Sequence, residues 1–296
     1  MTTFANFKPL LQQLSKHSFH EEAPSLSSLF IPDRSNDKVR TYYSLFDHVN
    51  RNAKLILVGV TPGRTQMNNS LKAAVDALKE NLDDDQVIAR AKQAASFSGT
   101  MQKKLIAMLD HHGFNKRLGI RSCEELWQDA NHLVHFTSAL RNPVFVMEKG
   151  KEANYTGGAP KLKSYKAFKP MLAELRAELM SIPNALILPL GAQVAEVLQD
   201  LVEDGDLPIQ RLLNHEGSVV EFPHPSPSNG ESHALALMQA LPPVDEYIQS
   251  RLAKYRAEKR AENKSLTRAE ELAYLKKRTS YWSRASKTRS AIESLA

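Results

Sequence analysis

Two nearly uninterrupted apolar segments, AKLILVGV at 53–60 and NALILPLG at 184–191, constrain the fold of this chain more than any other feature. Apolar runs of this length without polar alternation are typical of strands that are buried on both faces of a parallel sheet. Segments with helical periodicity follow both runs. The pattern therefore predicts an α/β fold with three layers, α/β/α, around a central, mostly parallel sheet.

Two further segments complete a predicted sheet of four strands, namely 132–140 and the start of 219–231, where VVEF leads into a Pro/Ser loop. Helical periodicity or helix-forming composition predicts helices between and around the strands. These helices are expected at 4–16, at 70–95 with a break near 83–85, at 101–112, 170–180 and 192–201, and from Ser232 onward. Irregular chain is expected through Pro24 and Pro32, and a lysine-rich loop at 149–169.

The positive charge of the chain is concentrated at its C-terminal end. Residues 251–296 hold 13 Lys and Arg against 5 Asp and Glu, whereas residues 1–250 hold 26 against 28. We therefore predict an α/β/α domain over 1–250 and a basic helical tail over 251–296, in which Thr267 and Glu270 form a capping box. A basic tail suits a polyanionic partner such as nucleic acid, and an ordinary solvated helix explains the charge equally well.

Several classes of protein are excluded by what the chain lacks. The single cysteine, Cys123, excludes an intramolecular disulfide and any zinc or iron-sulfur site built from several thiolates. The histidine pairs at 111–112 and 132/135 have no evident carboxylate partners, so we expect no metal and no cofactor. No apolar run approaches the roughly 18 residues that span a bilayer, so we expect a cytoplasmic protein without membrane contact.

Two proline-stiffened loops, GVTPG at 59–63 and HPSPSNGE at 224–231, each follow a predicted strand. Open α/β sheets bind ligands at the carboxyl ends of their strands. Together these loops resemble the two signature motifs of the uracil-DNA glycosylase superfamily, in a branch without an iron-sulfur cluster. Three further segments resemble the superfamily in the same order: SFSG at 96–99, HFTSALRNP at 135–143 and ILPLGAQVAEVL at 187–198.

The resemblance implies a monofunctional DNA glycosylase that flips a nucleotide out of DNA and hydrolyses the bond between base and sugar. His224 would donate a hydrogen bond to the departing base, unless it only bonds its own loop. Thr61 lies where uracil-cleaving relatives carry Asp or Asn to hold the attacking water. Its hydroxyl can orient a water molecule but cannot act as a general base near neutral pH, and capping a turn is its alternative role.

The resemblance also implies a base pocket formed by Gly59, Val60, Gly63, Phe97 and Ser138. Phe97 matches the aromatic residue on which a flipped base stacks, although a core phenylalanine is the alternative. Ser138 stands where uracil readers carry Asn, or is simply a polar strand residue. Gly63 stands where the strictest uracil enzymes carry a tyrosine that closes the pocket, so glycine is expected to leave that side open.

These differences predict a bulky modified base, for example a modified cytosine in phage DNA, which would give the protein a role in defence. Uracil excision in repair is one alternative, and a DNA-binding protein with the fold but without catalysis is another. The sequence also predicts contacts to the DNA backbone from a helix start, short polar side chains and lysines. The residues are Gly191, Ala192, Ser226, Ser228, Asn229, Lys161 and Lys163, with Lys149, Lys151, Lys166 and Lys169 in the same lysine-rich loop. Tight packing at Gly191 and a solvated loop are the alternatives.

Overall fold

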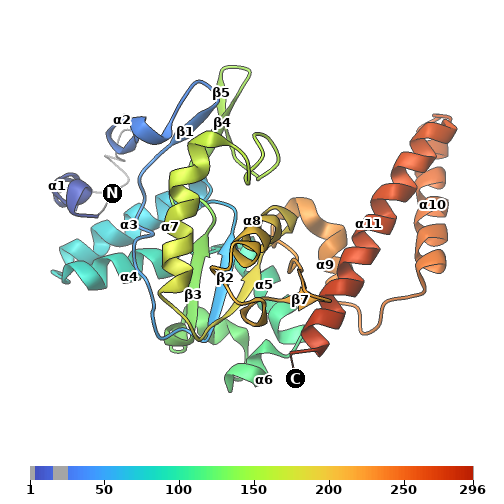
Figure 1. Cartoon of the computed structure of the whole chain (residues 1–296). Coiled ribbons are helices and arrows are strands. Elements are labelled where there is room, and N and C mark those ends of the chain that lie inside the picture. The colour runs from blue at the N-terminus through green and yellow to red at the C-terminus, as the bar shows by residue number, and fades with distance from the viewer. Residues whose placement is uncertain (1–3, 16–25, 296) are drawn as a thin grey trace.

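The computed structural model describes residues 4–15 and 26–295 (Figure 1). The predicted helix end at residue 16 and the irregular chain around Pro24 lie outside the described residues. The strands are β1 (Val39–Thr41), β2 (Leu55–Gly59), β3 (Val134–Ser138), β4 (Val144–Glu148), β5 (Lys151–Asn154), β6 (Leu186–Pro189), β7 (Asn214–His215) and β8 (Ser218–Val219). The α-helices are α1 (Phe4–Ser15), α2 (Leu26–Leu29), α3 (Arg64–Lys79), α4 (Asp84–Ala95), α5 (Thr100–His111), α6 (Phe114–Leu118), α7 (Lys169–Met180), α8 (Ala192–Glu203), α9 (Gly230–Ala236), α10 (Val244–Ala261) and α11 (Arg268–Glu293).

The central sheet is parallel, with β2 hydrogen-bonded between β3 and β6. All five residues of β2 are buried, as the apolar run predicts for a strand covered on both faces. The register pairs Gly59 with Ser138 and Val58 with Pro189. The carboxyl ends of the three strands therefore lie at one edge, and GVTPG begins there.

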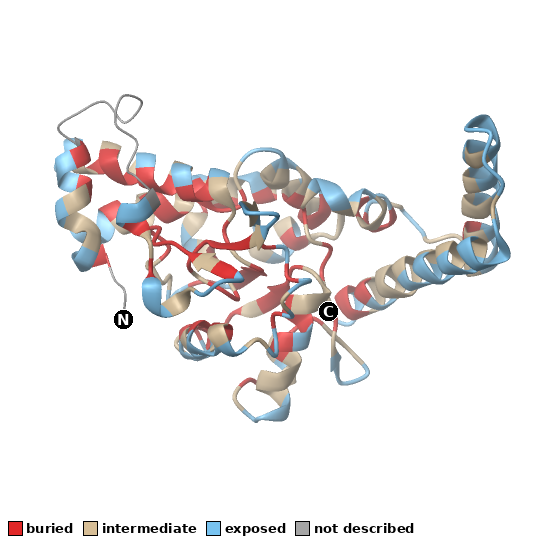
Figure 2. Ribbon diagram, turned by 90° about the horizontal axis from the view of Figure 1, so that it is seen from above, coloured by how far each residue is buried: buried red, intermediate tan, exposed pale blue. Residues whose placement is uncertain are grey.

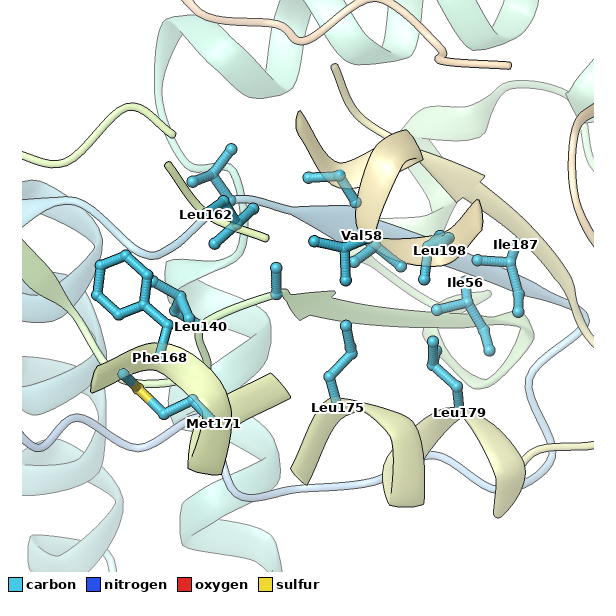
Figure 3. Packing of buried hydrophobic residues seen from close by; sticks show 14 of the residues in the cluster. Ile56, Val58, Leu140, Leu162, Phe168, Met171, Leu175, Leu179, Ile187 and Leu198 are labelled. Atoms are coloured by element: carbon cyan, nitrogen blue, oxygen red, sulfur yellow. The ribbon is translucent and has the colours of Figure 1, made fainter. Parts of the chain in front are cut away.

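Helices cover both faces of this sheet, which confirms the predicted α/β class. Ile56 and Val58 point to one face, where α7 and α8 pack on them through side chains that include Leu175, Leu179 and Leu198. Figure 3 shows Leu175 and Leu179 of α7 directed at the sheet beside Ile56. Alternate side chains of a strand point to opposite faces. Leu55 and Leu57 accordingly belong to a separate cluster that contains residues of α5 and α6.

The prediction of a fourth central strand was wrong. Within residues 4–15 and 26–295, the free edge of β6 pairs at two isolated parallel bridges, Ile187 to Leu212 and Leu190 to Phe222, and not with a fourth strand. Between these bridges the chain turns away into the antiparallel hairpin of β7 and β8.

A second sheet, which the sequence did not predict, flanks the central one. It is antiparallel with the order β1-β4-β5, and β5 occupies the start of the predicted lysine-rich loop. Tyr42, Tyr43 and Phe145 from this region pack with α1, α3 and α4 in a third apolar cluster. The break predicted near 83–85 is confirmed, because α3 ends at Lys79 and α4 starts at Asp84, but α3 starts earlier than predicted, at Arg64 directly after the GVTPG loop.

The C-terminal helices α10 and α11 form a hairpin that projects from the α/β body (Figure 1). The predicted domain boundary between residues 250 and 251 falls inside α10. The capping box of Thr267 and Glu270 is confirmed at the start of α11. Burial changes along α11, because its first turns are exposed whereas Thr288, Ala291 and Ile292 are buried against the body (Figure 2).

Candidate active site

A cavity of about 430 Å³ opens where the carboxyl ends of β2 and β3 meet the loops after β6 and Phe222. All residues that the sequence assigned to catalysis or to the base pocket line it: Gly59, Val60, Thr61, Gly63, Phe97, Ser138 and His224. Gly191, Ala192, Ser226, Ser228 and Asn229 line it as well. The two loops that are 160 residues apart in the sequence thus share one cavity.

Gly59, Phe97 and Ser138 form one wall. A Cβ atom added to Gly59 would lie 3.2 Å from Cε1 of Phe97 and 3.4 Å from Oγ of Ser138. The ring of Phe97 therefore lies directly against the strand end, in a space that any larger residue at position 59 would restrict. Phe97 itself has a φ of 50°, a left-handed conformation that is unfavourable for a bulky residue. Backbone strain of this kind is concentrated at functional sites.

The space beside Gly63 is partly filled by Asn154 at the end of β5. A Cβ atom added to Gly63 would lie 3.6 Å from Cγ, Oδ1 and Nδ2 of Asn154, and Asn154 also lines the cavity. Its Oδ1 accepts a hydrogen bond from the backbone N–H of Arg64 at 3.1 Å. Glycine thus adds no side chain on this side of the cavity, and the second sheet brings the amide of Asn154 to the same place.

Thr61 uses its hydroxyl to join two backbone segments. The hydroxyl donates to the carbonyl oxygen of Asn142 at 2.9 Å and accepts from the N–H of Val144 at 3.1 Å. A hydroxyl has one proton and two lone pairs, so one lone pair remains for a water molecule. Thr61 thus fixes the connection between β3 and β4 whether or not it also orients a water.

His224 lines the cavity, and one of its two ring nitrogens is engaged by its own loop. The backbone N–H of Ser226 donates to Nδ1 of His224 at 3.1 Å, so Nδ1 is unprotonated and Nε2 carries the hydrogen. No described residue hydrogen-bonds to this Nε2. Burial, with a smaller contribution from His233, lowers the pKa of His224 to about 4, so the imidazole is neutral near pH 7.

The comparisons with known proteins agree with this arrangement. The family model described as the uracil DNA glycosylase superfamily matches residues 46–241, which contain both loops and the strands that carry them. The chain belongs to the uracil DNA glycosylase superfamily. An uncharacterized protein of Bacillus subtilis (strain 168), YoxB, is 35% identical over 196 residues, which are 64% of this chain and 71% of that protein. No solved structure matches the chain.

The second superfamily loop is fixed from three sides. Phe222 bonds to the end of β6, through its N–H to Pro189 at 2.7 Å and through its carbonyl to the N–H of Gly191 at 2.9 Å. His233 and Asn229 bond to the carbonyl oxygen of His224, at 2.7 and 3.2 Å. These contacts, together with three prolines within 223–227, hold the imidazole in place before any ligand arrives.

The start of α8 lies at the same cavity. Gly191 is its N-cap residue, with a φ of 96° that favours glycine, and a Cβ atom there would lie 3.5 Å from Cβ of His224. The backbone conformation of the helix start therefore favours glycine, while the distance to His224 would be ordinary van der Waals contact for a Cβ atom. Free N–H groups at a helix start favour an anion such as a phosphate.

The lysines predicted to contact DNA are placed differently. Lys161 and Lys163 do not line the cavity with His224, and Lys163 forms an ion pair with Asp200. Lys163 instead lines a second cavity between α8 and the β7–β8 hairpin. Lys149 and Lys151 belong to the turn and strand of the β4–β5 hairpin.

Several cavity residues had no signal that sequence reasoning could use. Gln66 accepts a hydrogen bond from the N–H of Gly63, but the glycine at the helix start has no side chain that would mark a capping box in the sequence. Asn154 and Glu221 come from segments that resemble no motif, and Gln193 lies in the segment 187–198 without a role that the resemblance implies. Tyr281 and Arg284 come from α11, outside the part of the chain that the superfamily matches.

The described residues form neither a cluster of metal-ligating side chains nor a helix that spans a membrane. No group of three or more His, Cys, Asp or Glu side chains in the described part of the chain is arranged to hold a metal ion. None of the described helices is both long and apolar enough to cross a bilayer.

Proposed function

We propose that this protein is a monofunctional DNA glycosylase that hydrolyses the N-glycosidic bond of a flipped-out, non-standard base. In this reaction water adds to C1′ of the deoxyribose as the bond to the base nitrogen breaks. The sugar keeps the hydroxyl group, and the remaining proton ends on the departing base. Positive charge develops on the sugar and negative charge on the base in the transition state, so a fixed donor near the base accelerates the reaction.

The observation that carries the proposal is the neutral imidazole of His224, which lines the cavity and whose Nε2–H has no partner among the described residues. A donor that is already positioned costs no reorganisation when the base acquires negative charge. The ring of Phe97 and the short side chain of Ser138 form a surface on which a planar base can lie. Gly191, Ser226 and Ser228 would hold the phosphates on either side of that nucleotide.

The attacking water would be oriented by the remaining lone pair of Thr61. A neutral hydroxyl cannot remove a proton from water near pH 7, so the bond to the base must be largely broken before water adds. Such a reaction depends mainly on stabilising the departing base. This places most of the catalytic effect on His224 and little on Thr61.

We propose that the base is bulkier than uracil. The cavity of about 430 Å³ lies within the range of about 300–1,000 Å³ that is usual for sites of drug-sized ligands. Gly63 and Ser138 contribute little side-chain volume to it. Excision of a modified cytosine would give the protein a role in defence against foreign DNA.

Uracil remains a second candidate because of Asn154. Its amide group lies beside Gly63 and lines the cavity, and an amide offers both a donor and an acceptor to the edge of a pyrimidine. Asn154 would then replace the amide that is missing at Ser138. Excision of uracil would make the protein a repair enzyme.

The test is to incubate the protein with oligonucleotides that carry uracil, hypoxanthine, 5-hydroxymethylcytosine or glucosylated 5-hydroxymethylcytosine, followed by alkali to cleave abasic sites. We expect strand cleavage for a bulky modified cytosine and none for unmodified DNA. Cleavage of uracil alone would select the second candidate, and Asn154→Ala should then reduce it.

His224→Ala tests whether the cleavage comes from this site. We expect this variant to bind DNA but to produce no abasic sites. His132→Ala is the matched control, because His132 is exposed and outside the cavity. An absence of abasic product on all four oligonucleotides, with DNA binding retained, would identify a binding protein without catalysis and overturn the proposal.

A further inference from the structure

The cavity is completed by a helix that lies outside the part of the chain shared with the superfamily. Tyr281 and Arg284 of α11 line the same cavity as His224, whereas the match to the superfamily ends at residue 241. The two residues lie one helical turn apart and therefore on one face of α11. The helix thus forms a further side of the cavity.

This side of the cavity is fixed in place by contacts to the segment of chain directly before His224. The hydroxyl of Thr288 donates to the carbonyl oxygen of Glu221 at 2.7 Å, and Arg284 pairs with the carboxylate of Glu221 at 3.1 Å. Ala291 and Ile292 are buried in the same apolar cluster as Leu57 and Phe222. The last turns of α11 are therefore part of the body, and Tyr281 and Arg284 keep their places beside the catalytic loop.

Tyrosine rings and guanidinium groups alternate along this face of α11. The guanidinium carbon of Arg284 lies 4.9 Å from the ring centre of Tyr281, and that of Arg278 lies 5.6 Å from the same ring. Arg278 also lies 4.4 Å from the ring centre of Tyr274, farther out on the arm. Glu231, the last residue of the HPSPSNGE loop, accepts hydrogen bonds from Arg278 and Arg251.

The charge of this part of the chain has one sign. Between Leu272 and Ile292 there are six Lys and Arg and no Asp or Glu. Lys276, Lys277 and Lys287 are exposed. Alternating aromatic and cationic groups beside a positively charged surface are suited to single-stranded nucleic acid, because rings stack on bases and cations bind phosphates.

We propose that α11 binds the DNA strand next to the flipped nucleotide, with Tyr281 stacked on a neighbouring base and Arg284 bound to a phosphate. This inference rests on the proposed function for the position of the flipped nucleotide. It assigns to the C-terminal helix a direct part in holding the substrate. A basic tail that merely attracts DNA from a distance would not need a ring at the cavity.

The first experiment measures stacking directly and needs no catalysis. The probe is a single-stranded oligonucleotide with a tetrahydrofuran abasic analogue and a 2-aminopurine beside it, whose fluorescence changes when an aromatic ring stacks on the base. We expect Tyr281→Leu to lose this change and to weaken binding by about fivefold to 150-fold. Tyr281→Phe keeps the ring and should behave as the wild type. Equal signals and affinities for Tyr281→Leu and the wild type would overturn the proposal.

The second experiment separates phosphate binding by Arg284 from its contact with Glu221. We expect Arg284→Gln to reduce the slope of log affinity against log salt concentration by about 0.7, the value for one contact to a single strand. Glu221→Gln leaves the guanidinium in place and should keep the slope of the wild type. Arg176→Gln is the matched control, since Arg176 lies on α7, pairs with Asp206 and does not line the cavity.

The outcomes distinguish this inference from the proposed function. Loss of affinity in both Arg284→Gln and Glu221→Gln without a change in salt slope would mean that the pair only anchors α11, and would overturn the phosphate contact. A protein that cleaves its substrate but binds DNA independently of Tyr281 and Arg284 would retain the function and refute the inference. A protein that shows the fluorescence change dependent on Tyr281 but cleaves no base would support the inference about α11 and refute the proposed function.

Discussion

Two histidines, His135 in β3 and His224 at the cavity, have the same lowered pKa of about 4 but opposite surroundings. His135 has both ring nitrogens engaged, Nδ1 by the N–H of Asn50 and Nε2 by Glu178 at 2.6 Å, and its side chain is 1% exposed. His224 lines the cavity with Nδ1 engaged, and no described residue hydrogen-bonds to its Nε2. In both histidines the lowered pKa results mainly from burial away from water. What indicates a ligand is the ring nitrogen without a partner, which among these two residues belongs to His224.

The surroundings of His135 form a cluster of buried charges. Glu178 bonds to His135 and Arg141, at 2.6 and 2.5 Å, and the ammonium group of Lys92 lies 3.8 Å away. Burial by itself would raise the pKa of Glu178, but Lys92, His135 and Arg141 together hold it well below its usual range. This cluster ties α4, β3 and α7 together, and its charged groups pair with one another. The cavity, in contrast, keeps polar groups available for a ligand.

Glu178→Ala gives the largest effect expected from this contrast. It leaves Lys92 and Arg141 buried without their carboxylate, which costs about 3–5 kcal/mol of stability. Chemical denaturation measures the loss. Glu80→Ala, which removes an ion pair with Arg90 at the surface, should leave the unfolding midpoint unchanged. A small effect of Glu178→Ala would mean that water reaches the cluster.

The same substitution at the two histidines should separate their roles. We expect His224→Asn to lower kcat about 10²–10³-fold with the unfolding midpoint unchanged, because one donor to the developing charge is lost. His135→Asn should lower stability by about 1–3 kcal/mol, since Glu178 loses a bonded partner, and should leave kcat unchanged. Single-turnover excision and thermal unfolding measure both effects. Similar profiles for the two variants would refute the distinction.

A substitution at Thr61 tests whether a residue that lines the cavity contributes to stability more than to catalysis. Thr61→Val keeps the shape of the side chain but leaves the Asn142 carbonyl and the Val144 N–H without their partner. We expect a loss of about 1–3 kcal/mol in stability and a smaller fall in kcat than for His224→Asn. A fall in kcat as large as that of His224→Asn, with stability retained, would instead make Thr61 the main residue that holds the water.

The smallest expected effect is that of mild acid on turnover. The pKa of His224 is lowered from 6.5 to about 4, so the neutral imidazole persists as the pH falls through 6.5 and is lost only near 4. We therefore expect kcat to change less than about twofold between neutral pH and pH of about 5.5. The pKa of His135 is lowered in the same way, so the folded protein keeps this imidazole neutral at pH values where the unfolded chain protonates it. The contribution of His135 to the free energy of unfolding is therefore fully present above pH 6.5 and is lost as the pH falls toward 4. A fall in kcat with a midpoint near 6.5 would show that His224 is exposed to water.

The sequence predicted the central strands and the approach of the two loops because both depend on local signals. Apolar runs such as 53–60 identify buried strands, and parallel strands bring their carboxyl ends to one edge. Thr61, Phe97, Ser138 and His224 accordingly line one cavity. The lysines of the 149–169 loop carried no such signal, because an exposed charge does not specify which way it points.

Tertiary structure alone decided the contributions from distant elements. The predicted fourth strand does not form, because β7 and β8 pair with each other instead of with β6. Asn154 reached the cavity because β5 pairs with β4, and Tyr281 and Arg284 reached it because Ala291 and Ile292 are buried against the body. Strand and helix periodicity describe neighbours along the chain, whereas these contacts arise from the free energy of burying apolar surface between segments far apart in sequence. The sequence by itself therefore determined the three central strands and most of the helices, whereas packing decided the second sheet and the remaining sides of the cavity.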